Sequence, residues 1–262
     1  MDWILLYGLL GVFVGFMSGL LGVGGGGLLV PLLALCFRAQ DMGPQLMHYV
    51  LGTAFACMIF SSLASMRAHA ARGNIVWKAF YGMAGGILGG MLVITRLTVT
   101  LHATWIAIFF AGFMALIALQ MFLNWQPKTN DRPASFRNLM IVGAAIGSIS
   151  ALAAVGGGFL TITYMNYKNF PMKKAVGTSA AIGLPIALAG TLGYLFNGWS
   201  ETAGQAEMWG FIHVPAFLAI VIASIPAAAA GARLAQRIPD TQLKRIFAVV
   251  CVILSLKMIY SI

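Results

Sequence analysis

Long apolar stretches separated by short polar breaks run along the whole chain. They form ten segments, at about residues 4–21, 27–37, 46–66, 75–95, 102–123, 138–154, 158–167, 174–196, 208–231 and 242–261. Most have close to the roughly 20 residues that a helix needs to cross the hydrocarbon core of a bilayer. They lack the alternation of apolar and polar residues that membrane-barrel strands require. Because hydrocarbon offers no partner to backbone N–H and C=O groups, the pattern predicts an all-α integral membrane protein.

Two of the ten segments are too short to cross a bilayer unaided. Residues 27–37 and 158–167 reach about half the hydrocarbon thickness at a rise of about 1.5 Å per residue. Each is expected to be a half-helix, or a tilted helix that its flanks extend. The predicted number of full crossings is therefore about eight to ten.

The order long, short, long, long, long occurs twice, which predicts an internal repeat. Two short motifs recur in the same order within it. GVGGGG at 22–27 matches AVGGGF at 154–159, and LGTAF at 51–55 matches VGTSA at 176–180. We therefore expect a first membrane repeat in residues 1–123 and a second in residues 138–262. The most polar stretch, residues 124–137, would be a cytoplasmic linker between them.

Charge adds an orientation to this picture. The chain is 60% hydrophobic and 8% charged, with a formal net charge of +10. Its basic residues lie between apolar segments and form no aromatic-interleaved face for nucleic acid. If the segments cross alternately, all of the 16 basic residues except Arg38, Arg96 and Lys257 fall on one side, which the positive-inside rule assigns to the cytoplasm. The chain is therefore expected to be a multi-pass protein of the cell (inner) membrane with both termini on the non-cytoplasmic side.

The same orientation predicts that the two repeats are inverted. The third segment would run towards the cytoplasm, and its match, the eighth, would run away from it. Secondary transporters are often built this way, because two inverted halves that exchange conformations open a central site to one side and then to the other.

The two glycine runs are expected to interrupt helices. They comprise Gly24, Gly25, Gly26, Gly156, Gly157 and Gly158. Each glycine inside a helix costs about 1 kcal/mol relative to alanine, so a helix should end before each run and another begin after it. The new helix would start with free N–H groups and the positive end of its dipole, which attract anions. The alternative is a glycine surface for close helix packing. That packing role is the one we expect of Gly11, Gly15 and Gly19, and of Gly82, Gly86 and Gly90.

Hydroxyl groups recur at matched positions beside glycines. They belong to Gly52-Thr53 in the first repeat and Gly177-Thr178-Ser179 in the second. Each hydroxyl can bond back to its own helix, or it can donate to a ligand. Because two inverted repeats could bring both motifs to one site, we expect them to bind substrate. The basic residues Arg67, Arg72, Lys173 and Lys174 are either topogenic anchors or a cytoplasmic vestibule that concentrates anions.

Several other kinds of chemistry find no support. The acidic residues lie at segment ends, so none is placed as a buried cation ligand. Cys36, Cys57 and Cys251 have no metal-ligand spacing, and there is no metalloprotease signature. We expect no metal, cofactor or enzymatic activity. The expected partners are a small anionic substrate and the lipid bilayer, with homo-oligomerisation left open. The histidines, including His102 and His213, lie near segment boundaries and are interpreted as interfacial, with pH sensing or proton coupling as the alternative.

These motifs resemble the TauE/SafE family of sulfite exporters. The resemblance rests on GFMSGLLGVGGGGLLVPLL at 15–33, LGTAF, AVGGGF, AVGTSAAIG at 175–183, GNIVW at 73–77 and GARLAQRIPDTQLKRIFAVV at 231–250. It implies a secondary transporter that exports sulfite or an organosulfonate-like anion by alternating access, with the glycine runs and Gly-Thr motifs as signature positions. A passive anion channel, a non-transporting membrane subunit and a membrane enzyme are the alternatives. Gly27 corresponds to Phe159 in the second copy, so a shared site would be asymmetric.

Overall fold

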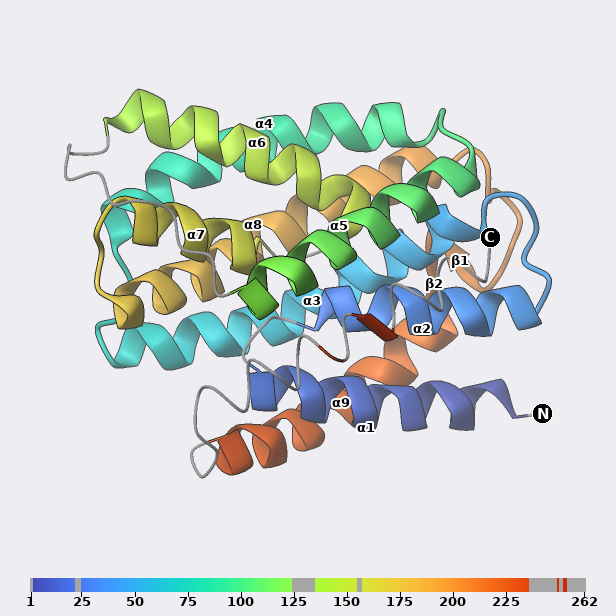
Figure 1. The fold of residues 1–262 in the computed structure, drawn as a ribbon. Helices are drawn as coiled ribbons and strands as arrows, with labels where there is room; N and C mark the ends of the chain where they lie inside the picture. Colours follow the sequence, from blue (N-terminus) through green and yellow to red (C-terminus); the bar gives the residue numbers. More distant parts are fainter. Residues whose placement is uncertain are drawn as a thin grey trace.

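The computed structural model describes residues 2–21, 25–123, 135–154, 157–235, 249 and 252–253 (Figure 1). In these ranges the chain forms nine extended helices and one short hairpin. The helices are α1 (Trp3–Leu21), α2 (Gly26–Ala39), α3 (Leu46–Ala71), α4 (Trp77–Thr98), α5 (Ala103–Leu123), α6 (Phe136–Ala153), α7 (Gly158–Tyr167), α8 (Met172–Gly198) and α9 (Val214–Ala235), and the hairpin strands are β1 (Met208–Trp209) and β2 (Ile212–His213).

The prediction of an all-α membrane protein is confirmed. Seven of the described helices are long and apolar enough to cross a membrane, and the other two are the short segments, with 14 residues in α2 and 10 in α7. Apart from 249 and 252–253, the predicted tenth segment lies outside the described residues. So does the predicted linker, except for its last three residues.

The ninth predicted segment, 208–231, was placed six residues too early. Residues 208–213 form the β1–β2 hairpin, and α9 begins only at Val214. Gly210 turns the chain with a φ of 56°, a conformation that favours glycine, and Pro215 lies in the first turn of α9, where proline is tolerated. Hydropathy alone misses this turn because most of its residues are buried and apolar.

The helices lie side by side, with their connections gathered at two ends (Figure 1). One end, here called the hairpin end, carries the N-terminus, the α2–α3 and α4–α5 connections and the β1–β2 hairpin. The other, here called the basic end, carries the α3–α4 and α7–α8 connections. Consequently α3 runs towards the basic end, whereas α8 runs towards the hairpin end.

Glycines allow two pairs of helices, each with one helix from either half of the chain, to pack closely. Helix α1 packs along α9, and α4 packs along α6. A β-carbon on Gly15 would lie 2.6 Å from the Cα atom of Ser224, and one on Gly147 would lie 2.6 Å from the carbonyl oxygen of Ile87. The predicted packing role of Gly11, Gly15, Gly19, Gly82, Gly86 and Gly90 is confirmed, since a β-carbon on each would crowd a neighbouring helix.

Candidate functional site

The chain interrupts its helices at both glycine runs, as predicted. Helix α1 ends at Leu21 and α2 begins at Gly26, while α6 ends at Ala153 and α7 begins at Gly158. The residues before the two new helices, Gly25 and Gly157, have φ values of 71° and 63°. This left-handed conformation costs other residues about 1–2 kcal/mol, so glycine is the residue that fits. Gly24 and Gly156 lie outside the described residues.

The two breaks lie against each other. A β-carbon on Gly26 would collide with the carbonyl oxygen of Ala154, the residue that follows α6, and with the sulfur of Met58 from α3. From this meeting point α2 runs to the hairpin end and α7 to the basic end (Figure 1). Residues about 130 positions apart in the sequence therefore share one location in the bundle.

Both short helices begin at these breaks without a side-chain cap. The first four N–H groups of any helix lack an acceptor in the preceding turn. Here the N-cap residues are glycines, which have no side chain to satisfy them. The first bonds towards Gly25 and Gly157 come from Leu28 and Thr161, at 3.2 and 2.8 Å. Each break therefore contains an uncapped, electropositive helix start, an arrangement that suits a small anion.

A pocket of about 100 Å³ lies beside the first break. It is lined by Gly25 and by three serines from different helices, Ser18 of α1, Ser61 of α3 and Ser224 of α9. Ser61 and Ser224 donate to carbonyl oxygens of their own helices, at 3.1 and 3.0 Å. A hydroxyl so placed can rotate towards a ligand instead. The remaining lining is apolar, so an anion here would be held by backbone and hydroxyl groups.

The second break contains two buried hydroxyl groups that sequence reasoning missed. Ser150 lies near the end of α6 and Thr161 in the first turn of α7, with exposed fractions of 1% and 0%. Neither hydroxyl has a hydrogen-bond partner among the residues that the structure describes. Because an unpaired buried polar group is costly, both are candidates to contact a polar ligand. The available signal was spacing: Ser18 and Ser150 are separated by the same interval as the two glycine runs.

The Gly-Thr motifs hold segments of the opposite half. Thr53 accepts a hydrogen bond from the backbone N–H of His213 at 3.0 Å, and Thr178 accepts one from that of Val76 at 2.9 Å. Gly52 and Gly177 let the same segments approach, because a β-carbon on either would collide with a backbone carbonyl oxygen, that of Phe211 or of Asn74. Ser179 donates to the carbonyl oxygen of Gly158 at 2.9 Å and ties the start of α7 to α8.

These contacts reveal a third sequence match. GNIVW at 73–77 leads into α4, and GFIHV at 210–214 leads into α9, the last residue of each motif being the first of the helix. Each begins with a glycine of positive φ, 65° at Gly73 and 56° at Gly210, and each donates its fourth residue's N–H to a Gly-Thr motif. Each threonine hydroxyl oxygen therefore already accepts one backbone hydrogen bond, although its own proton can still be donated to another group. Their predicted role in substrate binding stays a prediction.

The predicted basic cluster lies at the basic end, away from the breaks. Arg67, Arg72 and Lys173 are exposed, while Lys174 donates to the carbonyl oxygen of Gly73 at 2.6 Å. That bond joins the start of α8 to the α3–α4 connection and is a structural role. The vestibule remains a prediction. Among the described residues, no group of three or more His, Cys, Asp or Glu side chains is arranged to hold a metal ion.

Comparisons with known proteins agree with this picture. A family model described as "Sulfite exporter TauE/SafE" matches residues 7–258. A probable membrane transporter protein of Haemophilus influenzae is 29% identical over 98% of this chain and 98% of its own length. The probable membrane transporter protein YdhB of Bacillus subtilis is 27% identical over 92% of each chain. A probable membrane transporter protein of Methanocaldococcus jannaschii is 25% identical over 90% of this chain and 88% of its own length.

Proposed function

The chain belongs to the sulfite exporter TauE/SafE family of membrane transporters, and we propose that it is a secondary transporter that exports a small oxyanion by alternating access. The observation that carries this proposal is the contact between the two helix breaks, where the start of α2 at Gly26 lies against the carbonyl oxygen of Ala154, four residues before α7 begins at Gly158. The backbone N–H groups at the start of a helix can bind an oxyanion through several donors at once, without a fixed positive charge. A site without such a charge also releases its ligand easily, as a transporter must.

The size of the pocket favours a small substrate. Its volume of about 100 Å³ exceeds the roughly 10–15 Å³ that a cavity needs to hold one water molecule. An anion of the size of sulfite fits this space. An organosulfonate with a carbon tail requires the pocket to widen, and the apolar lining from α9 would then contact the tail. We therefore propose sulfite or a similarly small oxyanion as the preferred substrate.

Alternating access is supported by how the matched elements lie. The matched helices α3 and α8 run in opposite directions, and α2 and α7 leave the breaks towards opposite ends. The contacts of the Gly-Thr motifs also recur in matched pairs across the two halves. In such an inverted arrangement, exchanging the conformations of the halves opens the central site to the other side. Export follows the membrane potential, since an interior that is negative favours outward movement of an anion by about 2.3 kcal/mol per charge per 100 mV.

The test is counterflow in liposomes that contain the purified protein. Liposomes loaded with unlabelled sulfite are diluted into a trace of labelled sulfite. Exchange through an alternating-access transporter accumulates label transiently above its external concentration. A passive channel lets the label equilibrate without this overshoot. Absence of flux for sulfite, sulfonates and other small oxyanions in protein that remains folded would overturn the assignment of an oxyanion substrate.

A further inference from the structure

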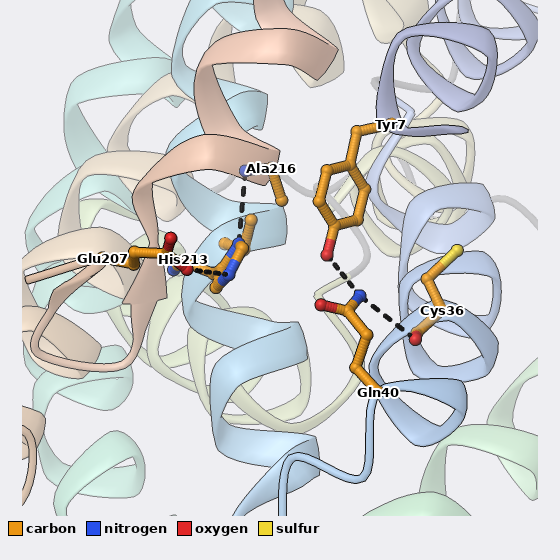
Figure 2. A network of polar contacts seen from close by, with 7 residues as sticks. Tyr7, Cys36, Gln40, Glu207, His213 and Ala216 are labelled. Atoms are coloured by element: carbon orange, nitrogen blue, oxygen red, sulfur yellow. Dashed lines mark hydrogen bonds and ion pairs between the residues drawn. The ribbon is translucent and has the colours of Figure 1, made fainter. Parts of the chain in front are cut away.

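A polar cluster at the hairpin end joins elements from both halves of the chain (Figure 2). It comprises Tyr7 of α1, Gln40 after α2, Glu207 before β1 and His213 at the end of β2. The side-chain amide of Gln40 donates to the Tyr7 hydroxyl at 2.5 Å and to the carbonyl oxygen of Cys36 at 3.3 Å. The His213 ring lies against the rings of Tyr7 and Phe37, with centroids 5.7 and 5.3 Å away.

The hydrogen bonds of His213 determine its protonation state. Its Nδ1 atom accepts a hydrogen bond from the backbone N–H of Ala216 at 3.2 Å, so this nitrogen carries no proton. Its Nε2 atom carries the proton and faces a carboxylate oxygen of Glu207 at 3.7 Å. The neutral imidazole thus caps the start of α9, while the backbone N–H of the same residue holds α3 through Thr53.

Binding a second proton would reverse these interactions. In the imidazolium both ring nitrogens are donors, so the N–H of Ala216 loses its acceptor. The new positive charge would also lie at the N-terminus of α9, where the helix dipole repels it. The Glu207 carboxylate attracts this charge instead, and its side chain is 73% exposed and free to follow. Protonation therefore favours a His213 side chain that leaves the cap and pairs with Glu207.

The surroundings let protons reach this histidine. His213 is 5% exposed, yet it borders a surface groove of about 940 Å³ that Asp2, Gln40 and Glu207 also line. The titratable groups that line this groove with it are Asp2, which precedes α1, Tyr7 of α1, whose ring lies against His213, and Glu207. Thr53 of α3 is not titratable. Burial lowers the pKa of His213, and the nearby Glu207 carboxylate opposes this shift. The imidazole is therefore neutral at neutral pH and accepts a proton when the groove becomes acidic.

The matched position in the first half shows that the fold does not need this histidine. Val76 occupies it in GNIVW, donates its backbone N–H to Thr178 as His213 does to Thr53, and precedes α4. Helix α4 starts there without a side-chain cap. The same junction is therefore built once with an apolar residue and once with a titratable one. The imidazole makes the junction before α9 sensitive to pH, and the backbone contact itself does not require a titratable residue.

We propose that His213 and Glu207 form a proton-binding site that gates the hairpin end of the anion pathway. Neutral His213 keeps α9 capped and fastened to α3, which keeps this end closed. A proton from the groove releases the first turn of α9, and the hairpin end opens. The gate rests on the transport function proposed above, because it controls access to the pocket that α9 lines through Ser224.

The test measures how well the backbone amides at the start of α9 are protected from hydrogen exchange, and it needs no transport assay. Amide hydrogen exchange of Val214, Ala216 and Phe217 is followed from about pH 8 down to about pH 4, because burial lowers the pKa of His213 below the usual histidine value of about 6.5, and the rates are corrected for intrinsic exchange. In the wild type we expect protection to fall at least about tenfold at the acidic end of this range. His213→Asn keeps a capping acceptor but cannot titrate, so its protection should be equal across the range. His102→Asn, which alters an exposed histidine at the same end, should behave like the wild type.

The outcomes separate the gate from the proposed transport function. Protection of α9 that does not change with pH in the wild type would overturn the gate, whatever the flux. Glu207→Gln provides a second variant at an exposed position and should move the transition to lower pH, because the imidazolium loses its partner. A pH-dependent α9 in a protein that moves no oxyanion would refute the transport function and leave the proton site standing. Where flux is present, it should depend on pH in the wild type and not in His213→Asn.

Discussion

At position 26, only glycine leaves room for the two halves of the chain to meet. A β-carbon there would collide with the sulfur of Met58 and with the carbonyl oxygen of Ala154. The methionine side chain can move aside through its three rotatable bonds, whereas the Ala154 carbonyl belongs to a buried backbone. Any larger residue therefore pushes the two helix breaks apart, together with the N–H groups proposed to bind the anion.

The first prediction concerns this approach. Gly26→Ala should lower the free energy of unfolding by about 1–3 kcal/mol and reduce oxyanion flux at least about tenfold. Unfolding in detergent and flux in liposomes measure the two effects. The control is Gly85→Ala on an exposed face of α4, where a β-carbon meets nothing within 4 Å. It should be neutral or stabilising by up to about 1 kcal/mol. If both variants behave alike, the contact between the breaks does not exist.

The second prediction separates two roles of the Gly-Thr motifs. Thr53→Val and Thr178→Val leave the N–H of His213 or Val76 without its acceptor, so each should destabilise the protein by about 1–3 kcal/mol. The matched Thr→Ser variants keep the hydroxyl and should retain most of the stability. Thr100→Val, which removes an exposed hydroxyl, is the control. A weaker apparent affinity for the anion with unchanged stability would contradict the structural role and support direct substrate binding.

At the scale of helices, glycine faces decide which elements pair between the halves. Helix α1 packs on α9 through Gly11 and Gly15, and α6 packs on α4 through Gly143 and Gly147. The first helix of each half therefore lies on the fourth helix of the other. The short helices α2 and α7 follow directly from these packed pairs, so the pairs position both helix breaks.

The third prediction tests this packing. Gly147→Leu places a side chain where a β-carbon would already be 2.6 Å from the carbonyl oxygen of Ile87, and it should cost about 3 kcal/mol or more. Gly89→Leu adds the same side chain to an exposed position of the partner helix α4, where nothing lies within 4 Å. It should leave the melting temperature within a few degrees of the wild type. Equal melting temperatures for the two variants would show that α4 and α6 are not in close contact.

At the scale of the whole molecule, the two halves hold each other through matched contacts. Thr53 in the first half fastens the segment before α9, and Thr178 in the second half fastens the segment before α4. One junction ends in His213 and the other in Val76. The two junctions therefore share the same backbone contact but differ in whether the residue can bind a proton. The proposed cycle uses both properties, because the symmetry supplies two access states and the asymmetry supplies a proton gate.

The fourth prediction concerns ligand binding by the intact protein. Sulfite at about 100 times its dissociation constant should raise the free energy of unfolding by about 2.7 kcal/mol, measured as a shift of the thermal unfolding transition. A bulkier sulfonate should give a smaller shift at equal concentration, because the pocket measures about 100 Å³. Gly26→Ala should reduce the shift. An equal shift with ammonium, a cation, would contradict an electropositive site.

Much of the fold could be predicted because its causes are local. Apolar runs become helices wherever lipid replaces water, and three successive glycines interrupt a helix regardless of its neighbours. The described helices follow the predicted segments, except that α3 continues past the predicted end at 66 to Ala71 and that Gly210 turns the apolar stretch 208–213 into a hairpin. The candidate site was only partly predictable. Gly25, Gly26, Gly157 and Gly158 lie at the breaks, but the Thr53 and Thr178 hydroxyls bind backbone groups more than 100 positions away.

The amino-acid sequence by itself determined that this protein is a bundle of membrane helices, where two of those helices are interrupted, and to which family it belongs. Each of these follows from the residues of a short stretch and the solvent around it. Only the tertiary structure decided that Gly26 meets Ala154, that Thr53 holds His213, and that His213 faces Glu207. The first two depend on which helices pack together. A hydropathy pattern does not encode that choice, because many pairings of apolar helices bury similar surface, and glycine contacts and backbone hydrogen bonds select among them.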